Sequence, residues 1–204
     1  NRVSFGVQSF NEKFRKILGR KGYPENLYTA LELFRKNGLK KFSCDLIHGI
    51  PGQTTEEYAD GLEKFLHLNC KHLSSYSLTF EEGSRLSKEN IITPDPETEM
   101  EMWRKNDEIL SIAKIKRYEV SNFAAEGNEC VHNLEIWFGD RYLGLGPSAS
   151  SFDGKNRWTE KASLEEWLNE EEPDRDIIPA ERRAAEILAF GLRTLKPWTN
   201  EKFR

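Results

Sequence analysis

The chain has 204 residues, of which 37% are hydrophobic and 31% are charged, a balance that suits one or two globular domains. Its net charge of −4 argues against nucleic-acid binding, because phosphate contacts need a clustered basic surface. No apolar run approaches the roughly 18 residues of a membrane span. Cys44, Cys70 and Cys130 lie far apart, which fits unpaired thiols in a reducing compartment and predicts a cytoplasmic protein.

Strand and helix signals alternate along the first part of the chain. In chain order we expect a strand over 2–8, a helix stopped by Gly19 or Gly22, a helix from Pro24 to Gly38, a strand before Gly49, a helix from Thr54, a strand over 72–79, a helix from 96 to about 113, and a strand over 117–120. Thr54 and Glu57 have the spacing of a capping box. These alternations predict an α/β fold with parallel strands and right-handed crossovers.

The number of strand–helix units sets the expected domain organisation. So few units cannot close an eight-stranded barrel of about 250 residues, so residues 1–125 are predicted to be the second half of a barrel. Since the chain opens inside a strand without an initiator Met, we expect a piece of a longer protein. Residues 126–160 are irregular and polar, and residues 161–204 read as the start of a small, mainly helical C-terminal domain with a helix over 179–195. The charge-rich segment 170–176 resembles an exposed connection.

The segment FSCDLIHGIPGQT (42–54) places a single carboxylate, Asp45, inside an apolar strand that ends in a Gly/Pro turn. Ligands of α/β folds sit at the carboxyl ends of strands and in the loops that follow them. A buried carboxylate is costly unless it is paired. Asp45 either hydrogen-bonds neighbouring backbone or faces a ligand at the mouth of a barrel, and its sequence context alone leaves both readings open.

Several motifs occur in a characteristic order. They are GVQSF (6–10), ILGR (17–20), DLIHGIPGQT (45–54), LSSYSLT (73–79), RYEVSNFA (117–124), HNLEIW (132–137) and YLGLGPSAS (142–150). Together they resemble the oxygen-independent coproporphyrinogen III oxidase family of radical SAM proteins, and within it the heme-chaperone branch. The resemblance covers nearly the whole chain, and it implies a radical SAM partial (β/α) barrel.

The resemblance implies an S-adenosylmethionine site made of Gln8, Arg20, Asp45 and, more weakly, Thr79. Carboxylate, amide and guanidinium groups suit the hydroxyl, ammonium and carboxylate groups of this cofactor. The family holds a [4Fe–4S] cluster with a CxxxCxxC loop, which this sequence lacks. Three thiolates on one cluster need a compact loop, so we expect the cluster ligands to lie outside this chain and assign it neither a metal ligand nor a catalytic residue.

The segment HNLEIW matches the HNxxYW motif that the family associates with heme. His132, Asn133 and Trp137 match this pattern, whereas Ile136 stands where a tyrosine is expected. A neutral imidazole is a good axial ligand for heme iron, and Trp137 could pack on a porphyrin face. The alternative is a buried histidine hydrogen-bonded to a loop carbonyl.

The resulting hypothesis is a fragment of a radical SAM heme chaperone that delivers heme to an acceptor protein, with the acceptor and the oligomeric state unspecified. One alternative is an enzyme that oxidatively decarboxylates coproporphyrinogen III, and another is a non-catalytic interaction domain without a cluster. Among the remaining candidates we interpret His48 as a packing residue and GLGPSAS (144–150) as a tight turn. A metal site at His67, Cys70 and His72 would lack a fourth ligand.

Overall fold

The computed structural model describes residues 1–21, 25–80, 86 and 93–196. The chain divides into two compact units, Asn1–Glu129 and Cys130–Arg204. Each unit has its own sheet. Within the described residues, no helix is long and apolar enough to cross a membrane.

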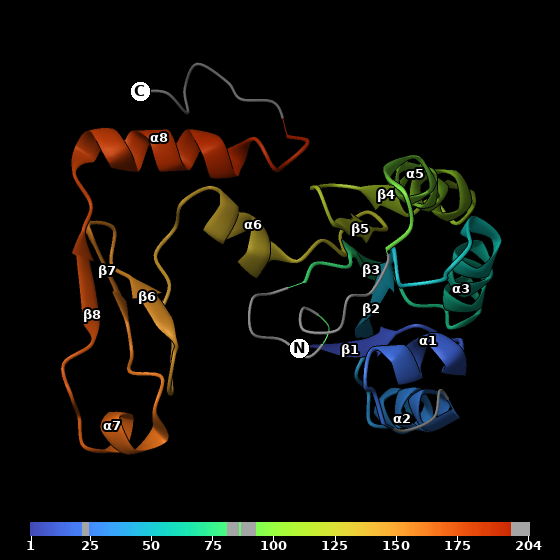
Figure 1. Cartoon of the computed structure of the whole chain (residues 1–204), viewed down its shortest axis with the longest axis horizontal. Helices are drawn as coiled ribbons and strands as arrows, with labels where there is room; N and C mark the ends of the chain where they lie inside the picture. Colours follow the sequence, from blue (N-terminus) through green and yellow to red (C-terminus); the bar gives the residue numbers. More distant parts are fainter. Residues whose placement is uncertain (22–24, 81–85, 87–92, 197–204) are drawn as a thin grey trace. The chain divides into compact units, whose positions relative to one another are not determined.

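The first unit is a five-stranded sheet covered by helices (Figure 1). Its elements are β1 (Arg2–Gln8), α1 (Glu12–Ile17), α2 (Glu25–Lys36), β2 (Lys41–His48), α3 (Thr55–His67), β3 (His72–Ser77), α5 (Pro96–Ile112), β4 (Lys116–Arg117) and β5 (Asn122–Ala124). The strand order is β1-β2-β3-β5-β4, with β1, β2 and β3 parallel and β5 antiparallel to both β3 and β4. The α/β fold with parallel strands is confirmed, and β1 ends at Gln8 as predicted.

The helix starts follow from side chains that satisfy the first backbone N–H groups. At α3, Thr54 Oγ1 accepts from the Glu57 N–H at 3.2 Å, and Glu57 Oε2 accepts from the Thr54 N–H at 3.0 Å. This is the predicted capping box. At α5, Asp95 accepts from the N–H groups of Glu97 and Thr98, with Pro96 in the first turn. The predicted helix start at Pro24 lies outside the described residues.

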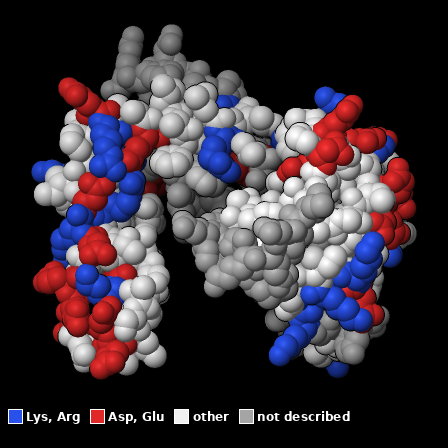
Figure 2. Space-filling model, in the orientation of Figure 1, with Lys and Arg blue, Asp and Glu red and all other residues white. Residues whose placement is uncertain are grey.

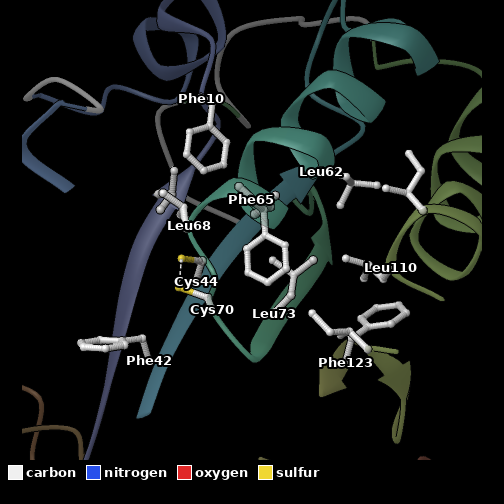
Figure 3. Packing of buried hydrophobic residues seen from close by; sticks show 14 of the residues in the cluster. Phe10, Phe42, Cys44, Leu62, Phe65, Leu68, Cys70, Leu73, Leu110 and Phe123 are labelled. Atoms are coloured by element: carbon white, nitrogen blue, oxygen red, sulfur yellow. Dashed lines mark hydrogen bonds between the residues drawn. The ribbon is translucent and has the colours of Figure 1, made fainter. Parts of the chain in front are cut away.

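The core lies between the sheet and its helices (Figure 3). The ring of Phe65 projects from α3 toward the strands, and Leu73 of β3, Leu110 of α5 and Phe123 of β5 belong to the same buried cluster. Each of these side chains is at most 1% exposed. Complete burial of a large apolar side chain contributes about 1.5–3 kcal/mol, so this layer fixes the helices on one face of the sheet.

The strand predicted over 117–120 is wrong in its extent. Residues 116–117 and 122–124 instead form two short antiparallel strands joined by a turn. Tyr118 donates its N–H to the Asn122 carbonyl at 3.0 Å, and Ser75 donates its N–H to the Ser121 carbonyl at 2.8 Å. The turn therefore lies against β3, and these tertiary contacts outweigh the local preference for one continuous strand.

The second unit contains α6 (Val131–Trp137), β6 (Ser150–Phe152), β7 (Asn156–Thr159), α7 (Leu164–Leu168), β8 (Asp174–Ile177) and α8 (Ala180–Gly191). The three strands form an antiparallel sheet in the order β6-β7-β8. The unit is therefore not only helical, and part of the segment expected to be an exposed connection is strand β8. Pairing with β7 orders β8, and Lys161 pairs with Asp174 at 3.0 Å.

Candidate functional site

A row of four residues crosses the face of the first sheet that its helices do not cover, here called the open face, although Ser74 and Asn122 in this row are buried. Gly6 lies opposite Asp45, Asp45 opposite Ser74, and Ser74 opposite Asn122. Directly opposed residues share a face of a sheet. Their neighbours in sequence belong to the core under the helices, and side chains alternate along a strand, so the row faces away from the helices. Ser4, on the same face, donates from Oγ to Asp45 Oδ1 at 2.9 Å.

Gln8 bends back over this row. It has a left-handed backbone with φ of 64°, an uncommon conformation for a residue other than glycine. The β1–β2 register shifts between Gly6 and Gln8, and a Cβ on Gly6 would lie 2.9 Å from Gln8 Nε2. The amide of Gln8 therefore occupies the space above Gly6, which lies opposite Asp45 on the neighbouring strand. The structure thus brings these two predicted site residues to neighbouring positions on one face.

Arg20 and Thr79 are placed differently. Arg20 is exposed after α1, and its N–H donates to the Arg15 carbonyl at 2.9 Å. Thr79 is exposed two residues beyond the end of β3. Neither side chain is hydrogen-bonded to Gln8 or Asp45, all four residues being within the described part of the chain. Both lie in loops that follow elements of the first unit.

Two buried acceptors at the end of the row were not anticipated from the sequence. Glu119 is 0% exposed, and its Oε1 accepts from the Ser121 N–H at 2.9 Å and from Asn122 Nδ2 at 2.5 Å. Within the part of the chain that the structure describes, Glu119 Oε2 and Asn122 Oδ1 have no hydrogen-bond partner. Buried polar atoms are normally paired, so this end of the row offers acceptors to a ligand or to water.

His48, at the end of β2, is 2% exposed and packs against Tyr58, with the two rings tilted by 58° and their centroids 5.5 Å apart. Burial lowers its pKa to about 4, so the imidazole is neutral at physiological pH. This agrees with the packing role inferred from the sequence. A cavity of about 350 Å³ beside it is lined by His48, Ser77, Pro96, Glu99, Met100 and Trp103.

His72 is also engaged in packing and hydrogen bonding. Its Nδ1 lies 2.7 Å from Ser43 Oγ, and its Nε2 lies 2.7 Å from the Tyr118 hydroxyl. Burial, with a smaller effect of nearby Arg2, lowers its pKa to about 3. Among the described residues, no group of three or more His, Cys, Asp or Glu side chains is arranged to hold a metal ion.

The HNLEIW segment forms α6 in the second unit. His132 is exposed near the start of the helix, whereas Trp137 is half-buried at its end. The Trp137 ring lies 6.2 Å from the Phe190 ring of α8, and the Arg193 guanidinium lies 4.5 Å from its centre. Residues five apart on a helix of about 3.6 residues per turn point about 140° away from each other. His132 and Trp137 therefore do not share a face, whereas Asn133 and Trp137, one turn apart, do.

A cavity of about 130 Å³ adjoins Trp137 in the second unit. Arg183 crosses the Phe152 ring at 4.4 Å and donates to the Gly139 carbonyl, and Arg157 pairs with Glu186 at 2.7 Å. Small-molecule sites usually have volumes of about 300–1,000 Å³. The cavity is smaller than that range, and the arginines beside it already bind other groups of the same unit.

Comparison with known proteins places this chain in a family. Residues 1–65 match the Radical SAM superfamily. The heme chaperone HemW of Escherichia coli is 39% identical over 150 residues, which cover 73% of this chain and 39% of that protein. HemW of Lactococcus lactis is 30% identical over 211 residues, which cover 100% of this chain and 56% of that protein. The chain spans about half the length of the curated relatives it matches.

Among solved structures, the coproporphyrinogen III oxidase HemN of Escherichia coli, a radical SAM enzyme, matches with a TM-score of 0.82 and 22% identity. The match covers 95% of this chain and 50% of that one, and at this identity it shows the fold. The sequence matches, which include a mouse radical S-adenosyl methionine domain-containing protein that is 35% identical over 73% of this chain, define part of a radical SAM protein. Within that superfamily the chain belongs to the HemW family.

Proposed function

We propose that the chain is the second half of the S-adenosylmethionine-binding barrel of a cytoplasmic heme chaperone, together with the region that follows it. The whole protein would bind S-adenosylmethionine, a [4Fe–4S] cluster and heme, and transfer heme to an acceptor protein. Similarity to HemW over the full chain supports this proposal. The observation that carries it is the neighbouring placement of Gln8 and Asp45 on the open face of the sheet.

The side chains of the open face suit S-adenosylmethionine. Asp45 accepts hydrogen bonds from hydroxyl or ammonium groups, and the Gln8 amide both donates and accepts. Arg20 would bind the carboxylate of the cofactor with its guanidinium fork, and Thr79 would add a weaker contact. The paired Ser4 hydroxyl would hold Asp45 in place. When bound, the cofactor supplies radical chemistry, and these residues would bind and orient it.

The residues of this chain do not fit the cluster itself. Cys44 and Cys70 lie in the core of the first unit, and Cys130 belongs to the second. A cluster needs several thiolates gathered at one point, so its ligands would come from a CxxxCxxC segment outside these 204 residues. The proposal therefore gives this chain cofactor binding and orientation and no step at the iron.

For heme, the exposed imidazole of His132 is the group best suited to bind the iron, because neutral imidazole is a common axial ligand. Asn133 and Trp137 would shape the helix that presents it. Trp137 contacts Phe190 and Arg193 and points away from His132, so its part in heme binding would be to hold α6 in place rather than to stack on the porphyrin that His132 binds. Heme would be cargo, to be released to the acceptor.

Calorimetry on the full-length, reconstituted protein under anaerobic conditions tests the cofactor site. Asp45→Ala should weaken S-adenosylmethionine binding at least about tenfold, since a charge-assisted hydrogen bond contributes about 1.5–3 kcal/mol. Asp60→Ala, which removes an exposed carboxylate from α3, is the matched control. Equal affinity of Asp45→Ala and the wild type would remove Asp45 from the site.

A heme titration followed by absorbance tests the cargo site. His132→Ala should lose the spectral shift of the wild-type protein, whereas His67→Ala, which removes another exposed histidine, should retain it. The same shift in all three proteins would contradict ligation by His132.

The second candidate function is the oxidation of coproporphyrinogen III, which the shared fold with HemN favours. Supplying coproporphyrinogen III to the reconstituted protein should give no protoporphyrinogen IX if the protein is a chaperone. Accumulation of that product would establish the enzyme instead. If neither S-adenosylmethionine nor heme binds, the remaining alternative is a non-catalytic interaction domain.

A further inference from the structure

Two buried cysteines of the first unit lie in direct contact, and the proposed function gives them no role. The Sγ of Cys44 lies 3.8 Å from the Sγ of Cys70 and donates its S–H toward it (Figure 3). Cys44 is 0% exposed in the middle of β2, and Cys70 is 2% exposed just before β3. A disulfide brings its sulfurs to about 2.05 Å, so pairing requires a relative movement of less than about 2 Å.

The surroundings of the pair distinguish the two thiols. The hydrogen bond from Cys44 lowers the pKa of Cys70, and the positive charges of Arg35 and Lys71 lower it further against the effect of burial. The same contact and burial raise the pKa of Cys44. Since the thiolate is the form that reacts with oxidants, Cys70 is the reactive member and Cys44 the resolving one.

The position of Cys70 gives an oxidant a short path to its sulfur. It lies in the turn between α3, which ends at His67, and β3, which begins at His72. Exposed Asn69 and Lys71 flank it, and Asn69 has a left-handed φ of 53°. Local opening of a turn costs far less than unfolding of the strands, so a small oxidant needs to displace only this turn.

We propose that Cys44 and Cys70 form a thiol pair that a peroxide converts to a disulfide linking β2 to the α3–β3 turn. In the first step the Cys70 thiolate attacks hydrogen peroxide, which gives Cys70 sulfenic acid and, with one proton, water. In the second step the Cys44 thiol attacks that sulfur, which forms the S–S bond and releases a second water. Two electrons pass from the thiols to the peroxide, and an external thiol, itself oxidised to a disulfide, returns Cys44 and Cys70 to thiols by exchange.

The third cysteine, Cys130, is the internal control. It belongs to the second unit, and a specific pair leaves it reduced when Cys44 and Cys70 are oxidised. Trypsin separates the two members of the pair, because cleavage after Lys41, Lys64 and Lys71 gives the peptides 42–64 and 65–71. The first contains Cys44 and the second contains Cys70. Peptide mapping therefore identifies the bond directly.

The 204-residue chain is treated in native buffer with a slight excess of hydrogen peroxide, alkylated in urea, digested and mapped by mass spectrometry. We expect a linked 42–64/65–71 peptide, a mass lower by about 2 Da, and loss of two of the three alkylatable thiols. A reductant should restore all three. Cys130→Ser should give the same linked peptide, and Cys44→Ser should give instead a sulfenic acid at Cys70 that dimedone traps.

Three results would overturn the inference. They are the absence of the linked peptide from oxidised wild-type chain, links to Cys130 that are as abundant as the expected one, and formation of the link only after unfolding in urea. The wild-type peptide map decides the matter even if the Cys44→Ser chain does not fold. The test uses neither S-adenosylmethionine nor heme, so its outcome is independent of the proposed function.

Discussion

A neutral histidine inside the first unit makes stability depend on pH in a defined window. Burial lowers the pKa of His72 from its ordinary value of 6.5 to about 3 in the folded chain. Between pH 3 and pH 6.5 the unfolded chain binds the proton more readily than the folded chain does. The contribution of neutral His72 to the free energy of unfolding is therefore fully present above pH 6.5 and is lost as the pH falls toward 3. The loss is about 1.4 kcal/mol per pH unit, or about 2 kcal/mol between pH 7 and pH 5.

The substitution His72→Gln isolates this effect, since glutamine can still bond Ser43 or Tyr118 and does not titrate. Urea unfolding followed by circular dichroism gives the free energy of unfolding at pH 7 and at pH 5. The decrease between the two should be smaller in His72→Gln than in wild type by about 2 kcal/mol. His48 has a similarly lowered pKa but contributes equally to both chains and cancels.

The reasoning is refuted if wild type and His72→Gln lose the same free energy of unfolding between pH 7 and pH 5.

Four further substitutions test packing, capping and backbone freedom by urea unfolding. Phe65→Ala empties a fully buried site in the core and should cost about 3–5 kcal/mol; a cost below 1 kcal/mol would contradict the described core. Thr54→Ala removes one half of the capping box and should lower the free energy of unfolding by about 1 kcal/mol. An unchanged free energy of unfolding would contradict the cap. Gly144→Ala places a Cβ 2.3 Å from the Ser150 carbonyl oxygen and should cost about 1–3 kcal/mol. Gly61→Ala is the matched control, because a Cβ added at this position of helix α3 meets nothing within 4 Å. It should stabilise the chain by about 0.5–1 kcal/mol. Equal changes in the free energy of unfolding for Gly144→Ala and Gly61→Ala would contradict the close contact at Gly144.

The parts of the fold that the sequence predicts are those with local signals. The strand over 2–8, the capping box at Thr54 and the helix from Pro96 each depend on residues a few positions apart, and the structure has all three. The face of Asp45 follows from the alternation of its strand, which puts Cys44 and Leu46 under the helices.

The parts that the sequence does not predict depend on distant partners. Strands β6, β7 and β8 have three or four residues each, and all four residues of β7 are half-buried, so alternation gives no signal. Asn122 joins the open-face row only because β5 pairs with β3, far away in sequence. Glu119 is buried only because the turn before β5 carries it there. No local pattern marks either residue as part of a site.

The register of β2 is the condition on which both proposals depend. Cys44 and Asp45 are adjacent in sequence, yet one contacts Cys70 in the core and the other accepts from Ser4 on the open face. A shift of one residue would exchange the two faces, placing a carboxylate under the helices and a thiol in the ligand row. Burying an unpaired carboxylate costs several kcal/mol, whereas the observed register buries Phe42, Cys44 and Leu46 together. The apolar half of the strand therefore holds the carboxylate on the face where a cofactor can meet it.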